Sequence, residues 1–126
     1  MQKLLPSWTR RAWLATWLQG RRRKRMGASV PALPQVPRAP GNLLAEDWGS
    51  FIQLSWVDLA GDELGFRVYR RVDGGSYGLW QTLGANVTGV QDSDVIVAHL
   101  YSYYGVAFNA VGESAQSNES AVLFGA

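Results

Sequence analysis

Hydrophobic and polar residues alternate in short runs through the second part of the chain. Ile52, Leu54 and Trp56 are separated by Gln53 and Ser55. Residues 66–69 and 101–108 repeat this two-residue period. Such a period is typical of antiparallel strands with one buried face. We therefore expect one set of side chains to face a core: Ile52, Leu54, Trp56, Phe66, Val68, Tyr103 and Ala107.

Turn-forming residues separate these runs. Glycine, asparagine and aspartate mark turns at Gly49 and at residues 60–62, 73–75, 84–86 and 111–113. Short strands at this spacing, over about 85 residues without a helical period, indicate two packed sheets. The sequence therefore predicts an all-β fold, a seven-stranded antiparallel β-sandwich, over residues 41–126.

Charge divides the chain into two different parts. Residues 1–40 carry nine basic and no acidic side chains, net +9, whereas residues 41–126 carry three arginines and ten acids, net −7. A basic segment on an acidic domain usually has an anionic partner of its own. We expect a docking arm at residues 1–27 and a proline-rich linker at residues 28–40, ahead of the sandwich.

The linker has a proline at every third position: Pro31, Pro34, Pro37 and Pro40. This period suits a polyproline helix, which has three residues per turn and no internal hydrogen bonds. The pattern therefore predicts an extended, semi-rigid spacer.

The arm combines tryptophan with arginine. Ser7 can cap a helix from Trp8 to about Leu18, and Gly20 is placed to end it, so the arm is predicted to be partly helical. Tryptophan and arginine are enriched at interface hot spots, and consecutive cations also suit phosphate groups. The expected partners are other protein subunits of a multi-copy assembly, with nucleic acid or an anionic surface as a further contact. The predicted docking residues are Trp8, Arg10, Arg11, Trp13, Trp17, Arg21, Arg22, Arg23, Lys24 and Arg25.

The sequence Thr-Arg-Arg-Ala-Trp-Leu at residues 9–14 resembles a twin-arginine export signal. The apolar run that follows is short, and it leads into residues 21–25, which are all basic, where small residues should precede a cleavage site. The run is also far shorter than the ~20 residues that a membrane span requires. We expect neither a cleaved signal nor a membrane span, while a helix lying in a membrane interface remains an alternative.

Five ordered motifs in the second part of the chain resemble a known family. They are Pro37-Arg-Ala-Pro-Gly-Asn-Leu43, Leu54-Ser-Trp56, Gly65-Phe-Arg-Val-Tyr69, Tyr101-Ser-Tyr-Tyr-Gly-Val-Ala-Phe-Asn109 and Gly112-Glu-Ser-Ala-Gln-Ser-Asn118. Together they resemble a fibronectin type III domain of bacterial or phage type, from about residue 37 to the last residue. The resemblance does not extend to residues 1–35.

The resemblance implies an immunoglobulin-like sandwich with two marker residues. Trp56 would be the core tryptophan of the second strand, and the hydroxyl of Tyr101 would bond nearby backbone. Gly105 departs from the family, which usually has a bulky aliphatic residue there. We expect Trp80 or Tyr103 to fill the space that Gly105 leaves.

Few residues suit catalysis or metal binding. Cysteine is absent and His99 is the single histidine, which excludes thiolate zinc sites and cysteine nucleophiles. His99 with Ser93 and Asp92 or Asp94 has the residue types of a hydrolase triad, but these residues crowd one region and lack a nucleophile elbow. We therefore expect no enzyme activity, catalytic residue, cofactor, metal or small-molecule substrate.

Three aromatic residues are predicted to point outward from the sheets: Tyr69, Tyr104 and Phe108. They can form a contact surface for a ligand or subunit, or they can be ordinary cross-strand pairs. The sequence leaves both interpretations open.

Two functions fit these observations. In the first, the chain is a non-enzymatic structural protein of a large assembly, such as a phage virion, where it serves as a head-decoration, tail or fibre protein. The arm would anchor it and the sandwich would project, as the fibronectin type III resemblance implies. In the second, the chain is a binding or adhesion module at the cell surface or outside the cell, associated with glycans or membrane. The first places the protein in a virion or other macromolecular assembly.

Overall fold

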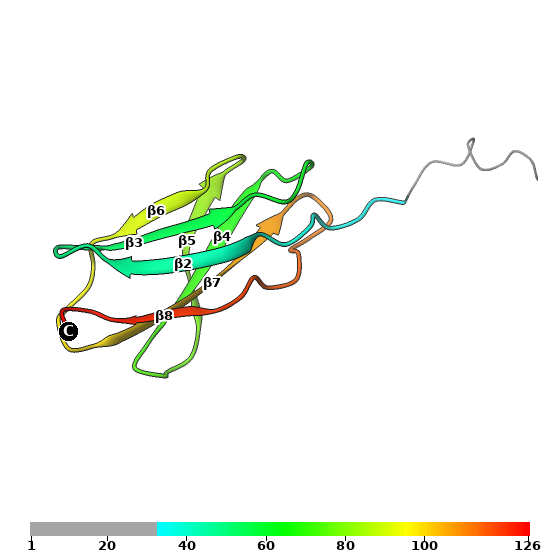
Figure 1. Ribbon diagram of the computed structural model, residues 1–126. Coiled ribbons are helices and arrows are strands. Elements are labelled where there is room, and N and C mark those ends of the chain that lie inside the picture. The colour runs from blue at the N-terminus through cyan, green and yellow to red at the C-terminus, as the bar shows by residue number, and fades with distance from the viewer. Residues whose placement is uncertain (1–32) are drawn as a thin grey trace, which may run out of the picture. The chain divides into compact units, whose positions relative to one another are not determined.

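Seven strands in two antiparallel sheets make up the described part of the chain. The computed structural model describes residues 33–126, in which the strands are β2 (Gly41–Asp47), β3 (Ile52–Val57), β4 (Gly65–Val72), β5 (Gly78–Gly84), β6 (Gly89–Asp92), β7 (Leu100–Phe108) and β8 (Ser120–Leu123). One sheet has the order β2-β3-β6 and the other β5-β4-β7-β8 (Figure 1). The predicted seven-stranded antiparallel β-sandwich is confirmed.

The predicted arm at residues 1–27, with its helix and its docking residues, lies outside the described residues. So do residues 28–32 of the predicted linker. The compact unit that contains the sandwich begins at Pro34.

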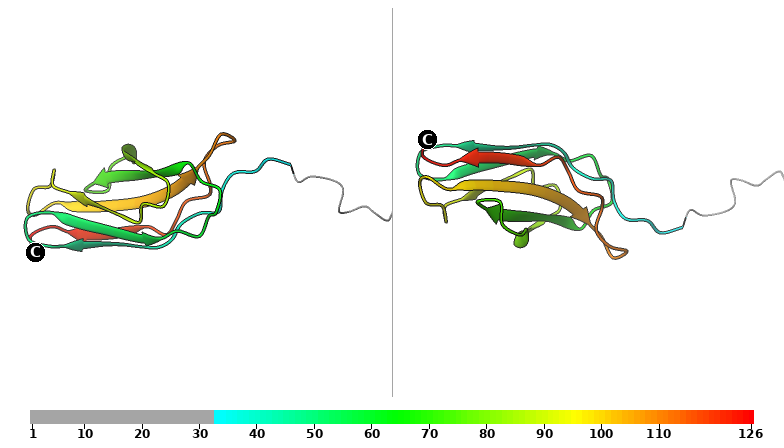
Figure 2. Two further views of the ribbon diagram at one scale, coloured as in Figure 1. Left: turned by 90° about the horizontal axis from the view of Figure 1, so that it is seen from above. Right: turned by 90° about the horizontal axis from the view of Figure 1, so that it is seen from below.

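The two sheets lie face to face, and the layers are visible from above and below (Figure 2). The longest ladder joins β4 to β7 in continuous register, from Gly65 opposite Phe108 to Val72 opposite Tyr101. The β4–β5 ladder contains a bulge, because Val68 pairs with Gln81 while Tyr69 pairs with Leu79. Trp80 is the extra residue on β5, so the bulge changes where its side chain points.

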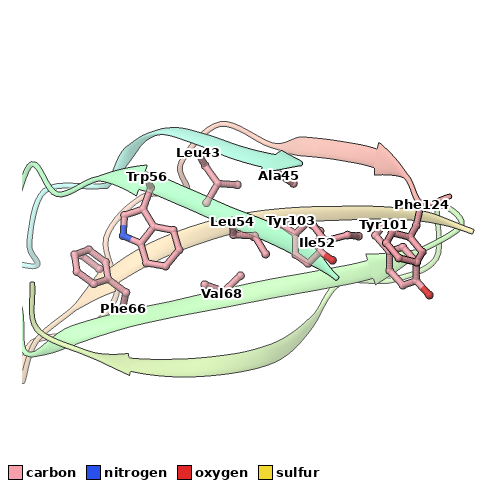
Figure 3. Packing of buried hydrophobic residues seen from close by; sticks show 11 residues of the cluster. Leu43, Ala45, Ile52, Leu54, Trp56, Phe66, Val68, Tyr101, Tyr103 and Phe124 are labelled. Atoms are coloured by element: carbon pink, nitrogen blue, oxygen red, sulfur yellow. The ribbon is translucent and has the colours of Figure 1, made fainter. Parts of the chain in front are cut away.

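Alternating side chains from both sheets form the core between the layers (Figure 3). Every residue that the sequence predicts to face inward is buried. Ile52, Leu54 and Ala107 are completely inaccessible, and Trp56 is 6% exposed. Trp56 lies on β3 with its ring 5.8 Å from that of Phe66 across the interface between the sheets. The expected role of Trp56 in the core is therefore confirmed.

Side-chain hydrogen bonds connect the two sheets along one side of the sandwich, where no backbone hydrogen bonds pair their strands. The amide of Asn118 accepts a hydrogen bond from the Leu43 N–H at 2.8 Å and donates one to the Leu43 carbonyl at 2.9 Å. The Ser120 hydroxyl accepts another from the Ala45 N–H at 3.0 Å. These bonds satisfy backbone groups at the edge of β2 and connect that strand to the start of β8.

The last prolines of the predicted linker pack on the sandwich. Pro37 and Pro40 are both buried. The side-chain amide of Asn109 also donates a hydrogen bond to the Gln35 carbonyl at 2.9 Å. Residues 34–40 therefore belong to the compact unit of the domain, and they approach it at the end opposite the C-terminus (Figure 1).

The space beside Gly105 is filled by the first strand and the segment before it. A Cβ atom at Gly105 would lie 3.7 Å from Leu43 Cδ1 and 3.7 Å from Pro40 Cγ, ordinary van der Waals distances. The expectation that Trp80 or Tyr103 fills this space is wrong. Trp80 packs instead against the Tyr103 ring, 5.9 Å away between centroids.

Gly105→Ala should stabilise the domain. The added methyl fits without displacing its neighbours, and alanine loses less backbone entropy than glycine when a strand forms. We expect the free energy of unfolding, measured by urea denaturation, to rise by up to about 1 kcal/mol. Gly65→Ala is the contrasting control and should destabilise the domain, because its Cβ atom would clash with the Leu83 carbonyl oxygen. Destabilisation by Gly105→Ala would contradict the observed packing.

Candidate functional site

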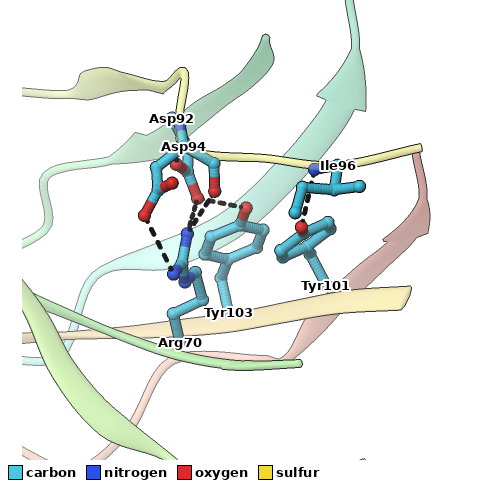
Figure 4. A network of polar contacts seen from close by, with 6 residues as sticks. All are labelled: Arg70, Asp92, Asp94, Ile96, Tyr101 and Tyr103. Atoms are coloured by element: carbon cyan, nitrogen blue, oxygen red, sulfur yellow. Dashed lines mark hydrogen bonds and ion pairs between the residues drawn. The ribbon is translucent and has the colours of Figure 1, made fainter. Parts of the chain in front are cut away.

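A buried carboxylate links the two sheets of the sandwich (Figure 4). Asp92, at the end of β6 in the three-stranded sheet, is 0% exposed. Its Oδ2 atom lies 2.8 Å from Arg70 Nη1 on β4 and 2.7 Å from the Tyr103 hydroxyl on β7. Its Oδ1 atom accepts a hydrogen bond from the Asp94 N–H at 3.0 Å. Both donors on the opposite sheet thus converge on one carboxylate.

Hydrogen-bond donors surround the buried Asp92 carboxylate. A buried charge is costly unless it is paired and hydrogen-bonded, and here each oxygen has a donor. Burial raises the pKa of Tyr103, and the hydrogen bond to Asp92 raises it further, so the phenol stays protonated as a donor. Burial lowers the pKa of Arg70, but the hydrogen bond and charge of Asp92 outweigh this and raise it overall.

Aromatic rings cover the Arg70 side chain. Its guanidinium carbon lies 5.9 Å from the centre of the Trp80 ring and 5.5 Å from that of Tyr101. Only 18% of the Arg70 side chain is exposed. The rings limit water access and so strengthen the attraction between Arg70 and Asp92.

Tyr101 makes the backbone contact that the sequence resemblance implies. Its hydroxyl accepts a hydrogen bond from the Ile96 N–H at 2.8 Å, across the connection between β6 and β7 (Figure 4). The expected hydroxyl-to-backbone bond is therefore confirmed, and it fixes the loop that follows Asp92.

Two tyrosine-to-phenylalanine changes should show how much each hydroxyl stabilises the fold: Tyr103 bonds the Asp92 carboxylate, and Tyr101 bonds the Ile96 backbone N–H. Tyr103 and Tyr101 are both buried, and each hydroxyl makes one of the contacts described above. Hydrogen bonds to charged groups contribute more than neutral ones. We expect Tyr103→Phe to lower the free energy of unfolding by about 1.5–3 kcal/mol and Tyr101→Phe by about 0.5–1.5 kcal/mol. A larger loss for Tyr101→Phe in denaturant titrations would contradict the importance given to Asp92.

The outer face of the four-stranded sheet carries a row of aromatic side chains. Tyr69 on β4 and Tyr104 on β7 are direct ladder partners, and their rings stack with centroids 4.9 Å apart. Tyr77, from the β4–β5 loop, meets the Tyr104 ring edge-on at 4.7 Å. Phe108 lies further along β7, with the Arg67 guanidinium 4.0 Å from its ring centre.

Charged side chains bond to this aromatic row through two glutamates. Glu113 accepts hydrogen bonds from Arg67 at 3.1 Å and from the Tyr69 hydroxyl at 2.6 Å. Glu119 is 3.0 Å from Arg71 and also accepts a hydrogen bond from the Tyr77 hydroxyl. We call the set formed by Arg67, Tyr69, Arg71, Tyr77, Tyr104, Phe108, Glu113 and Glu119 the outer-face network.

The outer-face network is internally paired. Its stacked rings and ion pairs cover the sheet so well that Ser102 and Val106, both on the outward side of β7, are 2% exposed. The structure thus brings together Tyr69 and Tyr104 and connects Phe108 to them through Arg67 and Glu113. Their role as a contact surface for a partner stays a prediction, and the geometry shows the cross-strand pairing.

The sequence pattern did not identify most members of this network. Every second position of β4 holds one of Arg67, Tyr69 and Arg71, and this period could have placed the three side chains on one face of the strand. Tyr77 lies in a loop and Glu119 lies in the segment that leads into β8, so no period indicates their contacts.

High pH should weaken the domain through two tyrosines of this network. The hydrogen bond to Glu113 and burial raise the pKa of Tyr69 to about 12, and burial and the hydrogen bond to Glu119 raise that of Tyr77 to about 12. The neutral hydroxyls therefore stabilise the fold fully below about pH 10, and this stabilisation is lost as the pH rises through about 12. Denaturant midpoints should fall across this window, and less steeply in a Tyr69→Phe/Tyr77→Phe variant. An equally steep fall in that variant would contradict the assignment.

In the described part of the chain His99 makes no hydrogen bond to Ser93, Asp92 or Asp94, although His99 and Asp94 line the same open depression. His99 Nδ1 lies 2.6 Å from Asp73 Oδ2, while Asp92 is committed to Arg70 and Tyr103. Among residues 33–126, no group of three or more acidic or histidine side chains is arranged to hold a metal ion. Two open depressions border the Arg70 side chain, with volumes of about 400 and 230 Å³.

Within the described part of the chain, no helix is long and apolar enough to cross a membrane.

Comparison with known proteins agrees with this architecture. No family model matches the sequence, and no curated protein matches it. Among solved structures, a fibronectin type III-like protein from Clostridium thermocellum has 24% identity and a TM-score of 0.58, over 73% of this chain and 97% of that one. The domain has a fibronectin type III-like fold. The structure called FN3tt also superposes, with 16% identity and a TM-score of 0.62, over 72% of this chain and 97% of that one.

A fibronectin type III-like sandwich also matches part of a larger enzyme. A β-1,2-glucanase from Parabacteroides distasonis has 23% identity and a TM-score of 0.63 over 74% of this chain, which spans 14% of the glucanase. One fold can serve many functions, so the shared fold by itself assigns none. At these identities the likeness shows the fold, and the activity named for the glucanase belongs to that protein.

Proposed function

We propose that this protein is a non-enzymatic structural component of a large assembly, specifically a phage virion protein of the head-decoration, tail or fibre type. The basic arm anchors it and the fibronectin type III-like domain is displayed. The observation that carries this proposal is the division of charge, +9 over residues 1–40 against −7 over residues 41–126. Such a division favours separate tasks for the two parts.

The domain supports this division because its arginines are paired with its own carboxylates. Its core closes around Trp56, and Asp92 is fully paired across the sheets. The arginines of residues 41–126 are all in ion pairs: Arg67 with Glu113, Arg70 with Asp92 and Arg71 with Glu119. These three arginines are therefore satisfied within the domain, and the excess basic charge of the sequence lies in residues 1–40.

The composition of the arm favours a protein partner. Trp8, Trp13 and Trp17 can bury large apolar areas, which a segment acting only through charge would not need. The cations at residues 21–25 add attraction to an acidic protein surface or to packaged nucleic acid. Both occur in a virion.

A second candidate is a surface or secreted binding module for glycans. The observation that favours it is the aromatic row on the outer face, because tyrosine rings can stack on sugars. Tyr69 and Tyr104 stack on each other, however, and the Tyr69 hydroxyl is bonded to Glu113. Assembly through the arm is therefore the proposal that we favour.

Removing residues 1–33 should separate folding from assembly. A chain beginning at Pro34 keeps Pro37, Pro40 and the Gln35 contact with Asn109, so its unfolding midpoint should equal that of the full chain. The full chain should co-sediment with virions from its source, and the shortened chain should not. Replacing Arg21, Arg22, Arg23, Lys24 and Arg25 by alanine should steeply weaken a nucleic-acid contact, whereas Trp13→Ala and Trp17→Ala should chiefly weaken a protein contact. Full occupancy of the shortened chain on virions would refute anchoring by the arm.

A further inference from the structure

One end of the sandwich exposes three large apolar side chains. Trp48 in the β2–β3 turn is 58% exposed, and Ile96 and Val97 in the β6–β7 loop are 63% and 61% exposed. The C-terminus lies at the same end (Figures 1 and 2), where Gly125 N–H donates to Asp47 Oδ2 at 2.8 Å. We call this surface the C-terminal end. Exposed apolar groups gathered in this way commonly mark an interaction site.

Local contacts hold these groups in place. The Trp48 indole N–H donates to Glu46 at 3.4 Å, and its ring lies 5.8 Å from that of Phe51. The Ile96 N–H is fixed by the Tyr101 hydroxyl. A surface whose backbone is already ordered loses little entropy when it binds a partner.

Carboxylates surround the apolar groups of the C-terminal end. Glu46 and Asp47 directly precede Trp48, and Asp94, whose side chain is 90% exposed, lies two positions before Ile96. Backbone hydrogen bonds from Gly49 and Gly125 lower the pKa of Asp47, so it is ionised at neutral pH. Arg70 is the nearby guanidinium, and it is paired with Asp92 at 2.8 Å and with Asp94 at 3.7 Å, so among the described residues Glu46 and Asp47 are the acids of this end without an arginine partner. The end therefore suits a partner that is both cationic and apolar.

This chain contains a segment with that chemistry. Residues 8–25 combine Trp8, Trp13 and Trp17 with seven basic and no acidic side chains, whereas the arginines of residues 41–126 are all paired within the domain. Charge complementarity thus points to the arm as the occupant.

We propose that the arm of one copy, residues 8–25, docks on the C-terminal end of the sandwich of a second copy. The proposal rests on the docking role of the arm and names its receptor. Docking between copies is favoured because residues 34–40 join the domain at its opposite end (Figure 1). The contact is head-to-tail, so repetition builds a ring or a filament of many copies.

Self-association of the nuclease-treated full chain, followed by sedimentation velocity over a range of concentrations, tests this proposal. The mass should rise with concentration and fall with added salt. Ile96→Lys places a cation in the receptor surface and should raise the dissociation constant at least about tenfold. Leu64→Lys is the matched control at the other end. Leu64 is 62% exposed and its N–H is also bonded, to the Phe108 carbonyl, so this change should alter the constant by less than about twofold.

Other results would overturn the proposal. Equal weakening by the two lysine variants would place the contact elsewhere, and a mass independent of concentration would exclude docking between copies. Association that requires added nucleic acid and has the same dissociation constant in the Ile96→Lys variant would show that the arm binds nucleic acid instead of the sandwich. The proposed function is tested separately: if the full chain stays monomeric yet still needs its arm to bind virions, anchoring stands and self-docking fails.

Discussion

The sandwich depends on one buried ion pair that joins its layers. Asp92 lies at the end of β6 in the three-stranded sheet, and Arg70 and Tyr103 contact it from the four-stranded sheet. A carboxylate with no exposure tolerates few alternative arrangements, because moving either sheet would leave its charge without a donor. The apolar core around Trp56 supplies most of the driving force for folding, whereas this pair selects how the two sheets lie against each other.

The same pairing of polar groups continues on the surface and shapes the proposed function. The outer-face network pairs its two arginines with its two glutamates and bonds the Tyr69 and Tyr77 hydroxyls within the domain, although it is rich in the residues that commonly form interfaces. The C-terminal end, in contrast, exposes the apolar side chains of Trp48, Ile96 and Val97 beside acidic residues. The basic arm complements it in charge, which links anchoring by the arm to assembly of many copies.

The fold followed from the sequence because its determinants are local. The alternation of Ile52, Leu54 and Trp56, with turn residues between runs, is sufficient to indicate strands and their buried faces. The contacts of Asp92 could not be found in this way, because Arg70 is 22 positions away and the pairing depends on how the sheets stack. The neighbours of Gly105 were predicted incorrectly for the same reason, because Leu43 and Pro40 are distant in the sequence and reach Gly105 only through the packing of the two sheets.

A double-mutant cycle between Arg70 and Asp92 tests the central claim most directly. Unfolding free energies would be measured for Arg70→Leu, Asp92→Leu and the double variant. Removing one partner leaves the other charge buried alone, so each single change should cost about 3–5 kcal/mol. The double variant should cost less than their sum by roughly 1.5–3 kcal/mol, which is the coupling between the two side chains. Additivity within about 0.5 kcal/mol would show that the two residues act independently and would contradict the account.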